Sequence, residues 1–241
     1  ALKAEKKSSR VAADGILVVA QTDSYATIVE LNSETDFAAK DSNFLSFSEK
    51  VKSFISENKV NDIEAFSSSS LEDDRKTLVQ TIGENIQLRR VETLDYNSDM
   101  NIGVYLHSDS KLGSIVVVKD GSDLIAKDIA MHVSAFNPIC LSQEDIDQDI
   151  LERERAIYQN QAKESGKPEE IMEKMVEGKI KRYLSEVSLL SQNFVKDPDI
   201  TVNDYLEKDN ASIVAYARLK VGEGIEVEVK DFAEEVAEQL K

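Results

Sequence analysis

Sulfur and imidazole side chains are scarce in this sequence. Its 241 residues contain one cysteine, Cys140, and two histidines, His107 and His132. A single cysteine excludes a disulfide within the chain and fits a reducing compartment. One cysteine and two histidines also fail to provide the ligand spacing of a zinc site. We therefore nominate no metal or cofactor site, and we expect Cys140 and His132 to be packed structural residues.

Long apolar runs and phosphate-binding loops are missing as well. No apolar stretch approaches the roughly 20 residues of a membrane-spanning helix. No signal peptide is visible, although the chain begins at Ala1 and an upstream piece could be missing. Gly222 and Gly224 lack the third glycine or the lysine of a nucleotide-binding loop. Carboxylates are so numerous that pairs arise by chance, and no nucleophile stands out. The sequence thus argues against an enzyme in the narrow sense.

Negative charge is what the chain has in excess. It carries 29 Lys and Arg against 46 Asp and Glu, which gives a formal charge of −17. Such a surface repels phosphate backbones, so we expect no direct nucleic-acid binding, and it suits a partner with basic patches. With 41% hydrophobic residues, the chain can bury the core of one large or two small domains.

Apolar periodicity divides the chain into two halves with the same order of elements. The first half is predicted to contain a hairpin, two helices and a strand, at 15–22 with 25–32, 44–55, 71–82 and 85–94. The second half is predicted to repeat them at 103–107 with 112–119, 122–134, 201–209 and 212–221. A serine-rich loop is expected over 61–70. The predicted fold class is α+β, with two related subdomains that each consist of an antiparallel sheet covered by helices.

The second half carries an acidic insertion. Residues 142–163 and 169–187 read as two helices, with Gly166 ending the first and Pro168 in the first turn of the second. Joined by a short turn, they predict an antiparallel coiled-coil hairpin, and packing flat on the core is the alternative that the spacing leaves open. The predicted division is a linker at 1–10, core subdomain N at 11–96, core subdomain C at 97–141 and 188–225, the hairpin at 142–187 and a C-terminal helical module at 226–241.

The stretch from Ser33 to Lys40 lies between a predicted strand and a predicted helix that Asp41 would cap. A tight connection at this place would project Phe37, beside the carboxylate of Asp36, toward a partner. The spacing alone favours another interpretation. Phe37 lies seven residues before Phe44 and would be a core residue if the helix continued through Asp41, and Asp36 would then be an N-cap.

The segment Thr35-Asp36-Phe37-Ala38-Ala39-Lys40 resembles the Thr-Asp-Phe-Val-Ala-Lys motif of the elongation factor Ts family, with Ala38 in place of valine. Six further stretches agree with the family in the same order: Val11–Gly15, Ile82–Ile86, Ile129–Val133, Ser165–Pro168, Lys174–Gly178 and Val221–Ile225. One six-residue match would be weak evidence, and collinear blocks from Val11 to near the C-terminus are much stronger.

The resemblance implies a guanine-nucleotide exchange factor of the cytoplasm, which binds elongation factor Tu and promotes GDP release in translation elongation. In the family, the residues that match Asp36 and Phe37 contact the G domain of the partner. The phenylalanine inserts between helices and disturbs the region that holds Mg²⁺ and phosphate. The Asp36-Phe37 pair is therefore expected to act as a wedge.

Four more positions match contacts that the family makes with its partner. Ile82, Gly83 and His107 correspond to further contacts with the G domain. Val195 corresponds to a contact with a β-barrel domain, but it is followed by Lys196 where an apolar residue is expected. That departure puts the contact of Val195 with the β-barrel domain in doubt.

The family also leaves other expectations open. It normally begins with a small helical domain that binds the G domain, which this sequence does not contain. We expect a truncated or processed form that keeps the wedge and binds more weakly. The same fold would also serve as a structural subunit that holds elongation factor Tu in an assembly such as an RNA phage replicase. A third hypothesis is an acidic hydrolase with a carboxylate pair in a deep pocket.

Overall fold

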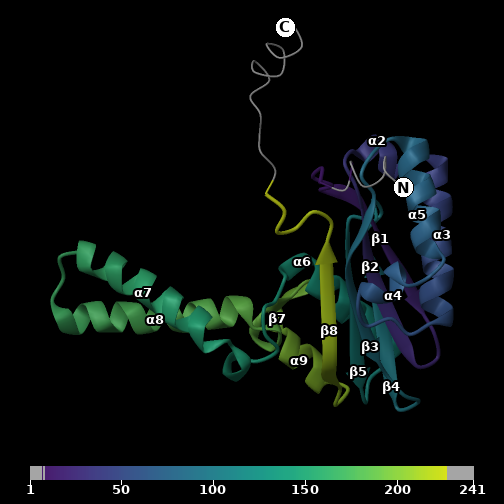
Figure 1. Ribbon diagram of the computed structural model, residues 1–241. Coiled ribbons are helices and arrows are strands. Elements are labelled where there is room, and N and C mark those ends of the chain that lie inside the picture. The colour runs from purple at the N-terminus through teal and green to yellow at the C-terminus, as the bar shows by residue number, and fades with distance from the viewer. Residues whose placement is uncertain (1–6, 8, 227–241) are drawn as a thin grey trace, which may run out of the picture.

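The computed structural model describes residues 7 and 9–226 (Figure 1). The C-terminal helical module predicted at 226–241 lies outside them, apart from its first residue. The described residues form two three-stranded antiparallel sheets, one two-stranded sheet and the helices around them, so the α+β class is confirmed. In each three-stranded sheet a hairpin is joined by a third strand that arrives much later in the sequence and pairs with the second strand of that hairpin.

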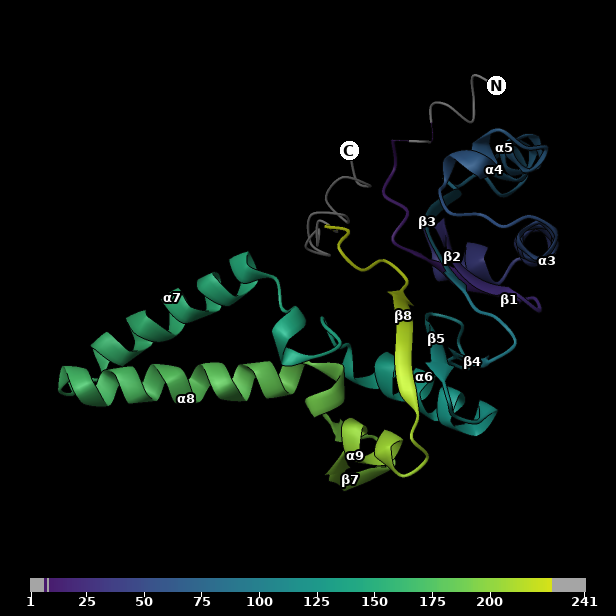
Figure 2. The same ribbon diagram turned by 90° about the horizontal axis from the view of Figure 1, so that it is seen from below.

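The first sheet has the order β1-β2-β3, with bounds β1 (Asp14–Gln21), β2 (Tyr25–Ser33) and β3 (Gln87–Asp95). Between β2 and β3 the chain forms α2 (Asp36–Ala39), α3 (Ser42–Glu57), α4 (Glu64–Ser67) and α5 (Leu71–Ile82). Figures 1 and 2 show α3 and α5 along one face of this sheet. Phe44 and Val51 of α3 pack there against Val29 and Leu31 of β2.

The prediction of a loop over 61–70 is partly wrong, because α4 forms within this segment. Phe66 of α4 is only 2% exposed, and its ring centroid lies 5.6 Å from that of Phe54 in α3. The burial of one aromatic ring thus makes a short helix in a serine-rich segment, where neither propensity nor periodicity indicates one.

The second sheet has the order β4-β5-β8, with bounds β4 (Met100–Leu106), β5 (Leu112–Lys119) and β8 (Ser212–Lys220). Helix α6 (Asp123–Phe136) packs on one face of it, through Ile125, Ile129 and Val133 against Val116 and Val118. Ser122 caps α6 by accepting from the Ile125 amide, as short oxygen-bearing side chains do at helix starts.

The two sheets face each other through a shared apolar layer. Leu17 and Ile28 of the first sheet meet Ile115, Val117 and Leu219 of the second. Because α3 and α5 cover the other face of the first sheet, all nine residues of β2 are buried. This double burial includes polar residues of β2, among them Glu30, which is 0% exposed.

The chain between α6 and β8 forms η1 (Gln143–Asp145), α7 (Gln148–Glu164), α8 (Glu169–Val187), η2 (Leu189–Ser191), β6 (Asn193–Phe194), β7 (Asp197–Thr201) and α9 (Val202–Glu207). Figures 1 and 2 show α7 and α8 extending together away from the sheets. Leu151 and Ala162 of α7 pack against Val176 and Ile180 of α8. A coiled-coil geometry for this pair stays a prediction. The small sheet of β6 and β7 is not indicated by the sequence pattern.

Candidate functional site

Phe37 lies on α2, a four-residue helix between β2 and α3, and its side chain is the most exposed large hydrophobic one that the structure describes. Its exposed fraction is 81%. Phenylalanine normally contributes to a core because its ring buries a large apolar area. An aromatic ring left in water on a short, defined element is therefore a candidate contact for another protein.

The orientation of α2 follows from its neighbours in sequence. Ala38 and Ala39 are 5% and 4% exposed, so the small residues face the protein and Phe37 faces away. Thr35 is the N-cap, and its hydroxyl accepts from the Ala38 amide at 3.2 Å. Lys40 ends the helix, and Asp41 takes an extended conformation before α3 begins.

Two interpretations favoured by spacing alone are therefore wrong. Phe37 is not a core residue in phase with Phe44, because the break at Asp41 resets the helical phase. Asp36 is not an N-cap, because Thr35 holds that position and Asp36 is the first residue of α2. Asp41 does cap α3 as predicted, and it accepts from the Asn43 amide at 2.8 Å.

Charges of both signs flank the exposed ring. Asp36 and Lys40 form an ion pair of 2.7 Å across one helical turn. This hydrogen bond to Lys40 lowers the pKa of Asp36, and the charge of Lys111 lowers it further. The same pair raises the pKa of Lys40. Lys40 is exposed and Asp36 is partly exposed, so the pair adds little stability. It leaves an ionised carboxylate beside Phe37 near neutral pH.

Ile82 and Gly83 lie next to α2 because hydrogen bonds join the two segments. Gly83 ends α5 in a left-handed conformation with φ of 88°, which suits glycine. The following residue, Glu84, accepts from the backbone amides of Glu34 and Thr35 at 3.1 and 3.0 Å. The structure therefore brings the predicted positions at 36–37 and 82–83 together.

His107 is exposed at the end of β4, and its Nδ1 lies 2.9 Å from the hydroxyl of Tyr105. The loop that follows returns to the first sheet, where Lys111 pairs with Asp14 at 2.8 Å. Because Asp14 pairs with Ser33 at the end of β2, just before α2, the loop after His107 lies on the same side of the molecule as α2.

Val195 lies apart from this group, in the turn between β6 and β7. Figure 1 shows β7 beside α9, far from α2. It is half-buried against the core of the second half. Its backbone amide donates to Nδ1 of His132 at 3.1 Å, so a buried histidine supports the turn. Lys196, where an apolar residue is expected, pairs with Asp128 at 2.5 Å. The lysine thus has a local ionic role beside Val195.

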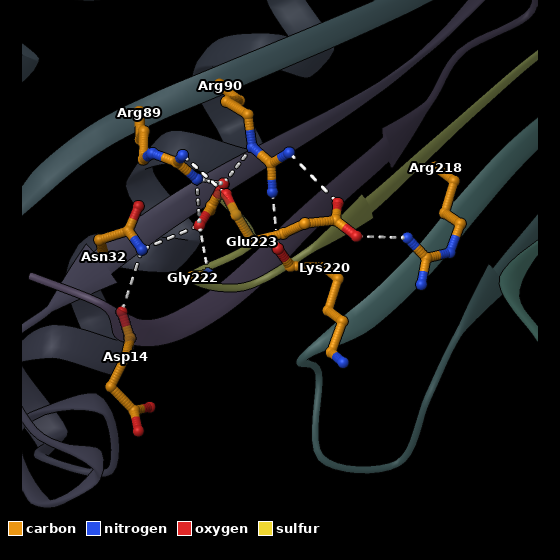
Figure 3. A network of polar contacts seen from close by, with 9 residues as sticks. Asp14, Asn32, Arg89, Arg90, Arg218, Lys220, Gly222 and Glu223 are labelled. Carbon is orange, nitrogen blue, oxygen red and sulfur yellow. Dashed lines mark hydrogen bonds and ion pairs between the residues drawn. The ribbon is translucent and has the colours of Figure 1, made fainter. Parts of the chain in front are cut away.

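A buried ionic network lies near the end of β8 (Figure 3). The carboxylate of Glu30 accepts from the guanidiniums of Arg89 and Arg90, from the side chain of Asn32 and from the Gly222 amide. Burial raises the pKa of Glu30, but the bonds from Gly222, Asn32 and Arg90 outweigh it and hold the pKa below its usual value. A glutamate inside an apolar strand, with two adjacent arginines later in the chain, is the sequence signal for this network.

Other kinds of site find little support among the described residues. No group of three or more His, Cys, Asp or Glu there is placed to hold a metal ion. No helix in that part is long and apolar enough to cross a membrane. A groove of about 530 Å³ lies between α7 and α8, and Glu177 on its wall is paired with Arg155. Glu30, the fully buried carboxylate, faces cations rather than a pocket. Neither the groove between α7 and α8 nor Glu30 therefore favours the hydrolase hypothesis.

Comparison with known proteins adds independent evidence. The family whose model matches this chain is described as Elongation factor TS, and the match covers residues 34–223. A curated relative named Elongation factor Ts from Hahella chejuensis is 49% identical over 242 residues, covering 100% of this chain and 84% of the relative. Relatives of the same name from Legionella pneumophila and Psychrobacter cryohalolentis are 46% and 45% identical, over 99% and 98% of this chain and 84% and 81% of their own length.

Proposed function

The chain belongs to the elongation factor Ts family, and we propose that it is a guanine-nucleotide exchange factor. It binds elongation factor Tu and promotes GDP release during translation elongation, in the cytoplasm. The support for this function is the shared name of relatives at 43–49% identity over nearly the whole chain. Such a factor needs no bond-making chemistry, because it only has to bind the empty partner better than the nucleotide-bound one. Since coupling is reciprocal, it then weakens nucleotide binding by the same factor.

Phe37 is the wedge in this proposal, and its exposure is the observation that carries it. The ring is 81% exposed, and α2 holds it outward through two buried alanines. Insertion of such a ring between helices of the G domain would bury it and displace the elements that hold phosphate and Mg²⁺. An aromatic anchor in a pocket is the usual form of an interface hot spot. Asp36 contributes an ionised carboxylate at the base of the wedge.

The remaining contacts form two groups in the proposal. Ile82, Gly83 and His107 extend the contact with the G domain, since they lie on the same side of the molecule as α2. Val195 contacts a β-barrel domain of the partner from the second half of the chain. Two separated contacts would hold the partner across both halves, so that insertion of the wedge is coupled to binding elsewhere.

A second role as a structural subunit is favoured by the pair α7 and α8. These helices extend away from the sheets (Figure 2) and expose Ile157 and Ile171, at 47% and 46%. A further protein could bind there while elongation factor Tu occupies the surface around Phe37. In that role the chain would hold elongation factor Tu in a larger assembly.

The test is the release of a fluorescent GDP from purified elongation factor Tu, with the chain and with its Phe37→Ala variant. The chain should accelerate release strongly, and Phe37→Ala should reduce the acceleration at least about tenfold, as expected for a hot spot. Its free energy of unfolding should change by less than about 0.5 kcal/mol because the ring is exposed. Leu124→Ala, at a residue 63% exposed on α6, is the matched control.

Three other outcomes would change the proposal. Acceleration that Phe37→Ala leaves intact would keep the exchange function and remove the wedge. Binding without acceleration would favour the structural role. A loss of acceleration in the Leu124→Ala control would mean that exposed apolar groups act without specificity.

A further inference from the structure

The two loops that meet beside the wedge each place a carboxylate on the backbone of the other. Glu84 accepts the amides of Glu34 and Thr35 at one oxygen, at 3.1 and 3.0 Å, and the Thr35 hydroxyl at the other, at 2.7 Å. In return, Glu34 accepts the Asn85 amide at 2.6 Å. Arg10 lies 3.6 Å from the same Glu34 oxygen. The bonds join the start of α2 to the end of α5.

These bonds reach Phe37 through a single hydroxyl group. The Thr35 hydroxyl donates to Glu84 and at the same time accepts from the Ala38 amide at 3.2 Å. Glu84 therefore fixes the rotamer of the residue that caps α2. A helix of four residues has no stability of its own, so the direction of Phe37 depends on this cap and on the burial of Ala38 and Ala39.

We propose that Glu84 is a positioning residue for the wedge, an inference that rests on the proposed exchange function. Glu84 holds Phe37 and the Ile82–Gly83 pair in one arrangement before the partner arrives. A contact surface that is already ordered loses less entropy on binding, and a small misplacement of an acting group reduces a rate strongly. Glu84 acts through Thr35 and need not touch the partner.

The location of Glu84 separates this role from general support of the fold. It is half-buried at the edge of the first half, where its bonds to Thr35 are exposed. The apolar layer between α3, α5 and the first sheet does not include it. Replacement of Glu84 should therefore loosen α2 and leave the core in place.

The experiment is a double-mutant cycle in the GDP-release assay, using Glu84→Ala, Phe37→Ala and the double variant. Each variant is added at a concentration that saturates elongation factor Tu. We expect Glu84→Ala to lower the maximal acceleration about tenfold. In the Phe37→Ala background, the same change should have little further effect, because residues that act as one unit are not additive. Hydrogen exchange of the free chain should be faster at Ala38 and Ala39 in Glu84→Ala, with β2 unchanged.

Two further variants separate positioning from a loss of folding. Glu84→Gln keeps one oxygen for the two amides but presents a donor –NH2 to the Thr35 hydroxyl, which can then only accept from it, so this variant should recover part of the acceleration that Glu84→Ala loses. Glu57→Ala removes an exposed carboxylate at the end of α3 and should have no effect.

The outcomes distinguish the two proposals. If Phe37→Ala lowers the acceleration and Glu84→Ala does not, positioning by Glu84 is wrong and the exchange function stands. If the two losses multiply in the double variant, Glu84 acts independently of Phe37 and the inference is also wrong. If the unchanged chain gives no acceleration, the exchange function fails and the inference fails with it. A tenfold loss in Glu84→Ala that disappears in the Phe37→Ala background supports both the exchange function and the positioning role of Glu84.

Discussion

His132 is held as a neutral ring by its two hydrogen-bond partners. Nδ1 accepts from the Val195 amide, so the proton lies on Nε2, which donates to Gln192 at 3.0 Å. The ring is fully buried and stacks against Phe136 and Phe194. Burial lowers the pKa of His132 below the ordinary 6.5, and the bond to Gln192 opposes this only in part. A second proton would face the Val195 amide, which can only donate.

This arrangement predicts a loss of stability in mild acid. Below about pH 6.5 the unfolded chain binds a proton that the folded chain does not, so the free energy of unfolding falls as the pH falls. The loss is at most about 1.4 kcal/mol per pH unit for one group. Urea unfolding at pH 7.5 and 5.5 measures it. His132→Asn should remove most of the difference, and His107→Asn, at the exposed histidine, should keep it. An equal difference in both variants would assign the effect to other groups.

Single residues also set the limit of prediction for the candidate site. The exposure of Phe37 could not be predicted from its spacing, because the position is in phase with the helical stripe that begins at Phe44 and continues to Ile55. Only the break at Asp41 turns the ring outward, and it was the motif rather than the periodicity that indicated a contact. The Glu34–Glu84 pair joins residues 50 positions apart, and no local pattern indicates such a pairing.

Gly178 is the feature of α8 that internal packing does not explain. It lies inside the helix, and a Cβ added there would meet nothing within 4 Å. Glycine in a helix interior lowers stability by about 0.5–1 kcal/mol relative to alanine, because its backbone loses more entropy on folding. Gly178→Ala should therefore stabilise α8 by that amount. Thermal unfolding and slower hydrogen exchange of the α8 amides measure the gain.

Gly166, in the turn before α8, is the matched control for Gly178. A Cβ there also has open space, but φ is +65°, a left-handed conformation that strains alanine. Gly166→Ala should therefore destabilise the pair α7 and α8 by about 1 kcal/mol. If both variants destabilise, α8 packs against something at Gly178 that its own chain does not provide.

At the scale of elements, local chemistry predicted most of the fold. The strands of the two hairpins are rich in apolar and β-branched residues, as in Ile16–Ala20 and Ile115–Val118. Thr201 and Asp204 form a capping box at the start of α9. The elements that were missed depend on distant contacts. The sheet of β6 and β7 has strands of two and five residues, and its turn is supported by His132 from α6. A window of sequence around these short strands contains neither enough strand residues nor the distant histidine, so it does not indicate the sheet.

The two halves of the molecule are joined by an apolar layer and by the network around Glu30. Arg90 reaches from β3 to the Lys220 carbonyl at 2.6 Å, and Arg89 reaches the Glu223 carbonyl at 2.8 Å. Arg218 of β8 binds the Glu223 carboxylate at 3.0 Å (Figure 3). Glu30 is the one fully buried carboxylate in this network and pairs with both arginines of β3, while Arg90 has a second, half-exposed partner in Glu223 at 3.5 Å. The exchange proposal needs this junction, because Phe37 lies on the first half and Val195 on the second.

Replacement of Glu30 by glutamine tests the junction for the whole molecule. Glu30→Gln removes the carboxylate partner of the partly buried Arg89 and leaves Arg90 with only the more distant Glu223 at 3.5 Å, which should lower the free energy of unfolding at pH 7.5 by about 3 kcal/mol. Because the folded pKa of Glu30 is lowered, its contribution is complete above the unfolded value of about 4.5 and is lost as the pH falls through the folded value. Thermal unfolding followed from pH 7.5 to 3 should therefore show a smaller acid-induced loss of stability in the variant.

Glu92→Gln, at an exposed residue of β3, is the control and should match the stability of the unchanged chain throughout this pH range. Equal stability of Glu30→Gln and the unchanged chain at pH 7.5 would mean that the apolar layer alone holds the two sheets together.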